Sequence, residues 1–151
     1  MLLDLLKEKY VRLGVKASDW REATRLSLAP LLESGAVTQE YVDDVITGAE
    51  QHGPYFVVTP RVALPHARPE CGALEDALGV TVLDEPVEFG SADNDPVRYL
   101  FPLSATSASG HLDALASLVE LLSDEDFFAV LDEASSPKEV VDAVRNAERS
   151  N

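Results

Sequence analysis

One histidine in this sequence lies in a rigid turn that would hold it ready for chemistry. His66 stands between Pro65 and Ala67, at the end of an apolar, β-branched run, and Arg61 and Arg68 flank the turn. Because proline fixes φ and removes a backbone donor, the turn is stiff and cannot continue a strand ladder. A neutral imidazole is a nucleophile near pH 7, and nearby cationic side chains suit chemistry on a phosphoryl group. An ordinary histidine in a turn is the alternative interpretation.

A second histidine lies where a helix is expected to begin. The apolar strand VRYLFPL ends at Leu103, and the segment SATSASG that follows is small, polar and flexible. Ser107 or Ser109 would cap the next helix, which places His111 in its first turn. A helix N-terminus carries unpaired amides and partial positive charge, so it favours an anion. We expect the apolar stripe of this helix to pack on the sheet and bring His111 beside His66; the alternative is a surface histidine at a helix start.

The third histidine and the one cysteine are given structural interpretations. His52 ends a predicted helix beside Gly53 and Pro54, where a histidine interacts favourably with the helix dipole. Cys71 is the one cysteine in the sequence and cannot form an internal disulfide, which fits a reducing compartment. A reactive thiol at this position is the weaker alternative to an ordinary surface cysteine.

The elements that must hold these side chains alternate between helix and strand. A helix capped by Ser18 should end near Gly35 and be kinked or split by Pro30, and a second helix is capped by Thr38. Strands are predicted at 11–15, 56–59, 78–83, 87–89 and 97–103. Three helices close the chain, and the last opens at Ser136 with a proline in its first position. This alternation predicts an α/β fold in which a central mixed β-sheet is flanked by helices.

Length and charge limit the class of protein. The chain has 151 residues without repeats or low-complexity linkers, and we interpret 1–151 as a single domain. No apolar run reaches the ~20 residues needed to cross a bilayer and no secretory signal is visible, so a cytoplasmic location is expected. A formal net charge of −15 disfavours nucleic acid and anionic membrane as partners. The same charge is compatible with a partner that has a basic patch.

Three separated motifs, in this order, resemble one protein family. They are GPYFVVTPRVALPHARPE at 53–70, VEFGSADNDPV at 87–97 and GHLDALASLVELL at 110–122. Together they are similar to the enzyme IIA component of the sugar phosphotransferase system, in its mannitol–fructose superfamily and nearest the ascorbate-type branch, with a core over residues 18–144. The resemblance implies the mannitol/fructose-type IIA fold and a cytoplasmic phosphocarrier without a cofactor. Such a protein takes a phosphoryl group from the carrier HPr onto a histidine, passes it to a cysteine of the IIB component, and serves the membrane component IIC indirectly.

By position, the resemblance makes His66 the phosphoryl acceptor and His111 the side chain that stabilises the phosphoryl group. Transfer then depends on positioning and on donors to the equatorial oxygens, among them His111 and backbone amides of 104–111. The mannitol branch has a supporting arginine in the helix before the first motif, and this chain has none there. Arg68 is therefore preferred over Arg61 as the source of positive charge.

The surface around His66 is expected to be an apolar docking face for both carriers. Leu64, Pro65 and Ala67 are placed near its centre, because each carrier must approach the ring in turn. The contact should be small, below about 1,200 Å² of buried surface.

Other classes of function stay open at this point. A metal site could join His66 and His111 to a carboxylate such as Asp113 or Glu70, but the sequence has neither HExxH nor CxxC, and no metal is predicted. A regulatory module on the same fold, signalling by its phosphorylation state, would have the same site. The sugar, the phosphorylated nitrogen and any oligomeric state are also left open, and ascorbate is inferred from local likeness alone.

Overall fold

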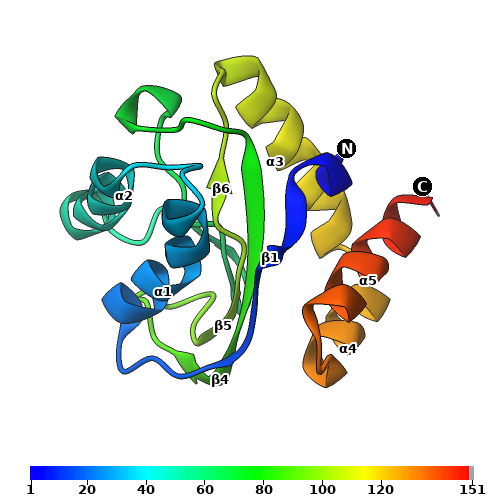
Figure 1. The fold of residues 1–151 in the computed structure, drawn as a ribbon. Helices are drawn as coiled ribbons and strands as arrows, with labels where there is room; N and C mark the ends of the chain where they lie inside the picture. The colour runs from blue at the N-terminus through cyan, green and yellow to red at the C-terminus, as the bar shows by residue number, and fades with distance from the viewer. Residues whose placement is uncertain (150–151) are drawn as a thin grey trace.

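The computed structural model describes residues 1–149, in which five α-helices and a six-stranded sheet form three layers (Figure 1). In chain order the elements are the 3-10 helix η1 (Leu2–Asp4), β1 (Leu6–Val15), α1 (Trp20–Glu33), α2 (Gln39–His52), β2 (Val57–Thr59), β3 (Val62–Ala63), the 3-10 helix η2 (Pro69–Cys71), β4 (Ala77–Val87), β5 (Val97–Leu100), β6 (Leu103–Ser104), α3 (Ala108–Leu122), α4 (Glu125–Glu133) and α5 (Pro137–Arg149). The predicted α/β class is confirmed.

The sheet is mixed, as the sequence predicts. Its strand order is β1-β4-β5-β3-β2, and β6 pairs with β4 outside this path. β1 runs parallel to β4, and β3 runs parallel to β5. The other pairs, β2 with β3, β4 with β5 and β4 with β6, are antiparallel.

The two faces of the sheet have separate cores. α1 and α2 cover one face, on the left in Figure 1, while α3, α4 and α5 cover the other. Successive side chains of a strand point to opposite faces, so Tyr99 joins the core beneath α3–α5 and Leu100 joins the core beneath α1 and α2. Burial on both faces explains why the central strands are almost continuous apolar runs.

Two of the predicted strands have different limits in the structure. The strand expected at 97–103 is divided into β5 and β6, because Pro102 has no N–H to offer to a ladder. The Pro102 carbonyl instead accepts a hydrogen bond from Gly79 at 2.9 Å. β4 ends at Val87, so residues 88 and 89 do not form the short strand expected there.

The first long helix begins one residue later than expected and is not split. Asp19 is its N-cap and accepts a hydrogen bond from the Glu22 amide at 2.8 Å, while Ser18 lies outside the helix. Pro30 lies inside α1, which continues beyond it. Proline removes only the hydrogen bond to the Leu26 carbonyl, and Leu26 is partly exposed, so the helix tolerates the loss.

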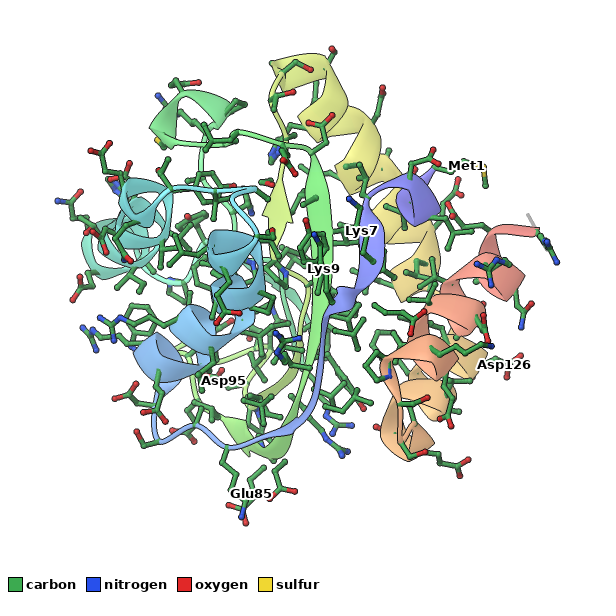
Figure 2. All side chains as sticks on the ribbon, viewed as in Figure 1. Met1, Lys7, Lys9, Glu85, Asp95 and Asp126 are labelled. Atoms are coloured by element: carbon green, nitrogen blue, oxygen red, sulfur yellow. The ribbon has the colours of Figure 1, made fainter. Side chains whose placement is uncertain are left out.

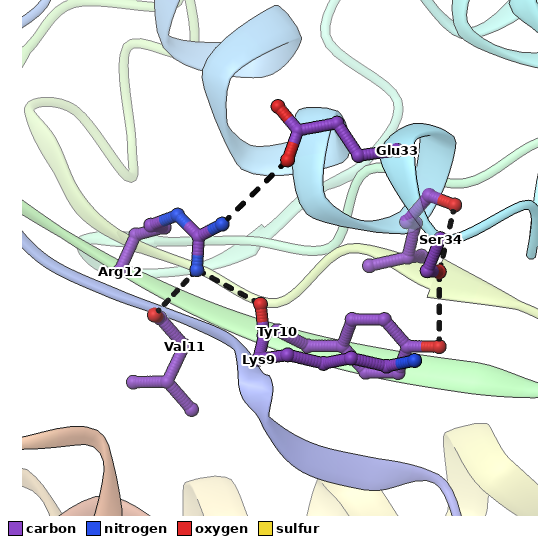
Figure 3. A network of polar contacts seen from close by, with 7 residues as sticks. Lys9, Tyr10, Val11, Arg12, Glu33 and Ser34 are labelled. Atoms are coloured by element: carbon purple, nitrogen blue, oxygen red, sulfur yellow. Dashed lines mark hydrogen bonds and ion pairs between the residues drawn. The ribbon is translucent and has the colours of Figure 1, made fainter.

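β1 begins five residues before the predicted strand. Its ladder is irregular and its alternation of buried and exposed residues is interrupted, which is why the sequence did not predict its first half. Register shifts divide its pairing with β4. Near them Arg12 donates to the carbonyls of Lys9 and Val11, at 2.8 and 3.1 Å (Figure 3). Its guanidinium also lies 3.8 Å from Glu33 of α1. One side chain therefore supplies donors to carbonyls of the irregular strand and connects the strand to a helix.

Candidate functional site

The segments that carry the two histidines follow neighbouring parallel strands. His66 comes after β3, and His111 comes after β6, which lies just beyond β5 in the chain. β3 and β5 are parallel neighbours, so their carboxyl ends lie at the same edge of the sheet. Beyond the strands the two segments stay paired, since Leu103 donates its N–H to the Pro65 carbonyl at 3.0 Å.

The two imidazoles lie side by side at this edge. Their ring centroids are 5.1 Å apart and their planes are inclined by 45°. Both His66 and His111 are half-buried. The expected juxtaposition is therefore present, and the rings are close enough for both to contact one group of phosphoryl size.

The tautomer of His66 follows from its hydrogen bond. Nδ1 lies 2.6 Å from the Leu64 carbonyl oxygen, which can only accept. Nδ1 must therefore carry the proton, and Nε2 of the neutral ring has a free lone pair. The sequence left the reactive nitrogen open, and this geometry favours Nε2.

Three influences of unequal size set the protonation state of His66. Burial lowers the pKa of the ring, the hydrogen bond to Leu64 raises it, and the nearby His111 lowers it again. Burial is the largest of these causes, so the pKa lies below its ordinary value. The neutral, nucleophilic form is thus favoured at neutral pH.

An exposed tyrosine borders the same ring. The Tyr55 hydroxyl donates to the backbone carbonyl of His66 at 2.5 Å, and the two rings are in an edge contact at 5.5 Å. Tyr55 is 41% exposed. Burial raises the pKa of Tyr55 to about 12, so its hydroxyl keeps the proton that it donates.

A buried tyrosine of α2 contacts both histidine-bearing segments. The Tyr41 hydroxyl accepts from the Ala67 amide at 3.0 Å and donates to the Leu103 carbonyl at 2.7 Å. The sequence analysis did not place Tyr41 or Tyr55 at the site. A tyrosine among buried apolar positions needs a partner for its hydroxyl, and that requirement was the available signal for Tyr41.

The N-terminus of α3 has the predicted cap. Ser107 is the N-cap and accepts from the Gly110 amide at 3.1 Å through its side chain. The His111 amide is already bonded to the Ser107 carbonyl, and the Thr106 amide is bonded to Asp76. Within the first helical turn, the amides of residues 108 and 109 are therefore candidates for binding an anion.

The two candidate arginines lie in different places. Arg68 is exposed and follows His66 by two residues, at the N-cap of η2. Arg61 precedes β3, at the opposite end of that strand from His66, and its guanidinium lies 5.4 Å from the centre of the Tyr99 ring. Arg61 is therefore remote from the imidazoles, and Arg68 is the arginine that remains near them.

The expected docking side chains are largely inaccessible, and this expectation is wrong for two of them. Leu64 is only 3% exposed and belongs to the core beneath α3–α5, and Pro65 is buried as well. The pairing of this segment with β5 and β6 turns both side chains inward. Ala67 is partly exposed, while the apolar side chains that do reach the surface beside the histidines are Tyr55 and, at 66% exposure, Leu112.

The middle motif, at 87–97, does not reach the site. Its Asp95 accepts hydrogen bonds from the amides of Phe89, Gly90 and Ser91, at 2.8, 2.8 and 2.9 Å. The neighbouring Asn94 carbonyl accepts from the Arg61 amide at 2.8 Å, at the end of β3 remote from His66. Figure 2 shows Asp95 in the lower half of the molecule, whereas α3 begins at the upper end in Figure 1. The motif thus organises the opposite edge of the sheet.

The structure gives little support to a reactive Cys71 thiol or to a metal site. Burial and the neighbouring Asp44 raise the pKa of the half-buried Cys71, so its thiolate is scarce near neutral pH. Within residues 1–149, no group of three or more His, Cys, Asp and Glu side chains is arranged to hold a metal ion. No helix in the same range is long and apolar enough to cross a membrane.

Comparison with known proteins identifies the family. Residues 4–147 match the model of the family described as phosphoenolpyruvate-dependent sugar phosphotransferase system, EIIA 2. The mannitol-specific cryptic phosphotransferase enzyme IIA component of Escherichia coli K12 is 36% identical over 143 residues, covering 95% of this chain and 97% of the relative. The ascorbate-specific EIIA component of the same strain is 35% identical over 141 residues, covering 93% and 92%.

Solved structures agree with these relatives. The solution structure of the mannitol-specific cryptic enzyme IIA of E. coli has a TM-score of 0.84 at 36% identity, covering 95% of this chain and 98% of that one. The E. coli mannitol IIA in complex with phosphorylated mannitol IIB has a TM-score of 0.80 at 25% identity, covering 94% and 99%. This chain belongs to the EIIA type 2 family and is a IIA component of a sugar phosphotransferase system.

Proposed function

We propose that this IIA component carries a phosphoryl group on His66, receiving it from phospho-HPr and passing it to a cysteine of a IIB component. The main support is the pair of imidazoles 5.1 Å apart, one with a free Nε2 lone pair and the other able to donate an N–H. The complex of a mannitol IIA protein with phosphorylated IIB supports a IIB protein as the acceptor.

Nε2 of His66 is the proposed attacking atom. In the acceptance step Nε2 forms a bond to phosphorus while the bond from phosphorus to the donor breaks. No proton has to leave His66, so this step needs no general base. The phosphorylated ring keeps its Nδ1 proton and carries positive charge, which the Leu64 carbonyl at 2.6 Å stabilises.

His111 is proposed to stabilise the phosphoryl oxygens. Its N–H and the first-turn amides of Ala108 and Ser109 belong to the positive end of α3, where they are in place before the group arrives. Arg68 adds positive charge at the exposed side of the site. The main contribution of the protein is therefore positioning and charge stabilisation.

The docking face for both carriers surrounds His66 with accessible side chains. We assign Tyr55, Ala67, Arg68 and Leu112 to it, in place of the buried Leu64 and Pro65. A location in the cytoplasm follows from these soluble partners, and the membrane component IIC is reached only through IIB. The small contact expected from the sequence, below about 1,200 Å², suits a carrier that must exchange partners.

Ascorbate, or a related sugar, is the proposed transported substrate. Identity over the whole chain does not separate the choices, because the mannitol-named and ascorbate-named relatives are 36% and 35% identical. The local likeness of the three motifs to the ascorbate-type branch carries this assignment. A panel of purified IIB proteins tests it, since faster transfer to a mannitol IIB than to an ascorbate IIB would reassign the sugar. Transfer to no IIB at all would favour the regulatory alternative.

The phosphorylated residue is tested by incubating the protein with enzyme I, HPr and phosphoenolpyruvate. We expect one phosphate per chain, labile in acid, that maps to His66 by mass spectrometry. His66→Ala should abolish the label, and His52→Ala, at the exposed end of α2, is the matched control that should keep it. Acid-stable label, or label that persists in His66→Ala, would contradict the proposal.

The role of His111 is tested by the rate of acceptance from phospho-HPr. His111→Ala should lower the single-turnover rate constant by roughly 100-fold, as the loss of one preorganised donor does elsewhere. The fold should survive, because His111 is half-exposed at a helix terminus whose cap is provided by Ser107. An unchanged rate constant in the folded variant would remove His111 from the mechanism.

A further inference from the structure

The Tyr41 hydroxyl lies where the two histidine-bearing segments meet. It accepts the N–H of Ala67, the residue after His66, at 3.0 Å. It donates to the carbonyl of Leu103, the residue that opens β6 before the α3 segment, at 2.7 Å, and the Ala67 carbonyl lies 3.3 Å away. One oxygen atom therefore joins the segment of His66 to the segment of His111.

A second hydrogen bond completes this arrangement from the backbone. The Leu103 N–H donates to the Pro65 carbonyl at 3.0 Å, so Leu103 is held through both its N–H and its carbonyl. The residues before and after His66 are thus both fixed relative to Leu103. Tyr41 is the side chain that contributes the second of these two connections.

The burial of Tyr41 keeps its hydroxyl in the neutral form that can both accept and donate a hydrogen bond. The side chain is 0% exposed, in the core beneath α1 and α2. Burial raises the pKa of Tyr41 to about 12, so the hydroxyl stays neutral and both accepts and donates. Because the bond to the Leu103 carbonyl is buried, that carbonyl has no easy substitute for the hydroxyl.

We propose that Tyr41 is a positioning residue, whose hydroxyl sets the placement of the His111 segment against His66 and thereby the rate of phosphoryl acceptance. This inference rests on the proposed phosphoryl transfer through His66. Tyr41 touches neither the phosphoryl group nor a carrier, because it is fully buried. Its effect must pass through the relative placement of the two imidazoles.

The test compares two buried tyrosines that lose only their hydroxyls. Tyr41→Phe should lower the single-turnover rate constant for acceptance from phospho-HPr by roughly 10- to 100-fold, since small misplacements at a reacting centre are that costly. Tyr10→Phe is the matched control. Tyr10 is 1% exposed in the same core, and its hydroxyl accepts from Ser34 at 3.2 Å, away from both histidines (Figure 3). It should leave the rate constant within about twofold.

A double-mutant cycle separates positioning from a general loss of structure. If Tyr41 acts by placing His111, its removal should matter little once that imidazole is gone. In the His111→Ala background we therefore expect Tyr41→Phe to lower the rate constant by less than about threefold. The same large factor in both backgrounds would overturn the inference.

The remaining outcomes are also decisive. Wild-type protein that accepts no phosphate at His66 overturns the proposed function itself. Normal acceptance by both the wild type and Tyr41→Phe overturns only the role of Tyr41. If Tyr41→Phe does not fold, amide hydrogen exchange in the wild type supplies the answer. The Ala67 amide should be protected although it lies in a loop, and exchange as fast as in an unstructured peptide would overturn the inference.

Discussion

The proposed phosphorylation of His66 requires different surroundings for the ring before and after transfer. Before transfer the ring must be neutral with Nε2 free, and burial favours that state by lowering the pKa. After transfer the ring carries positive charge, and the hydrogen bond from Nδ1 to the Leu64 carbonyl stabilises it. The same carbonyl therefore selects the tautomer in the first state and supports the charge in the second. Half-burial is a compromise, since complete burial would also prevent a carrier from reaching the ring.

The pH dependence of acceptance should report the lowered pKa of His66. Protonation removes the Nε2 lone pair, so the rate should be constant above neutral pH and fall on acidification. Because the pKa is lowered, the midpoint should lie below the ordinary value of about 6.5. Single-turnover rates from pH 4.5 to 8 and an NMR titration of the ring measure it. His111→Ala should move the NMR midpoint upward, since His111 lowers the pKa of His66. A wild-type midpoint above 6.5 would contradict the lowered pKa of His66.

At the scale of elements, the beginning of α2 holds the loop that follows His66. Its cap, Thr38, accepts from the Tyr41 amide at 3.2 Å and donates its own N–H to the Gly72 carbonyl at 3.0 Å. Gly72 ends the loop that runs from His66 through η2. The start of α2 is thereby joined to both ends of that loop. The Tyr41 hydroxyl contacts the loop at Ala67, and Thr38 contacts it at Gly72. The first turn of α2 thus helps to position the loop, in addition to the two-residue strand β3.

A side chain at position 72 should loosen this junction. Gly72 has φ +132°, and a Cβ there would lie 2.0 Å from the Thr38 hydroxyl oxygen. Gly72→Ala should therefore cost about 2–4 kcal/mol of unfolding free energy, from both backbone strain and overpacking. Gly35→Ala is the control, because Gly35 has φ +82° but open space around it, and only about 1–2 kcal/mol of strain is expected. Urea unfolding compares them, and equal losses would show that the contact with Thr38 is unimportant.

At the scale of the whole molecule, the two ends of the sheet have different tasks. The end that carries His66 and His111 is the proposed site, whereas the opposite end is closed by the loop around Asp95. That loop is bound to β3 through the Asn94 carbonyl and the Arg61 amide. The family resemblance is spread over both ends, so a residue that resembles the family need not belong to the site.

Substitution of Asp95 should separate stability from function. Its carboxylate accepts from three backbone amides, so Asp95→Ala should lower the free energy of unfolding by about 2–4 kcal/mol. Asp95→Asn, which keeps one acceptor oxygen, should lose less. The rate constant for acceptance should stay within about twofold of the wild type at temperatures where the variants are folded. A large fall in that rate constant would connect the two ends of the molecule and contradict this division.

Much of the site could be predicted from short stretches of sequence. The prolines around His66 predict a stiff turn, and Ser107 predicts the helix start that carries His111, because φ restriction and capping act over a few residues. The cap of α2 at Thr38 and the start of α5 at Pro137 were predicted for the same reason. Element limits were less accurate where pairing is irregular, as in the first half of β1.

By itself the sequence determined the class of fold, the family likeness and the choice of His66 and His111 as candidate site residues. These depend on local propensity and on residue identity. Only the tertiary structure decided how far apart the rings lie, which nitrogen of His66 is free, and that Leu64 and Pro65 face the core. It also placed the Tyr41 hydroxyl between the two segments. These features arise from the pairing of β3 with β5 and from the packing of α2. Contacts between residues distant in the chain are decided by the global packing of the sheet and helices, which no short window of sequence records.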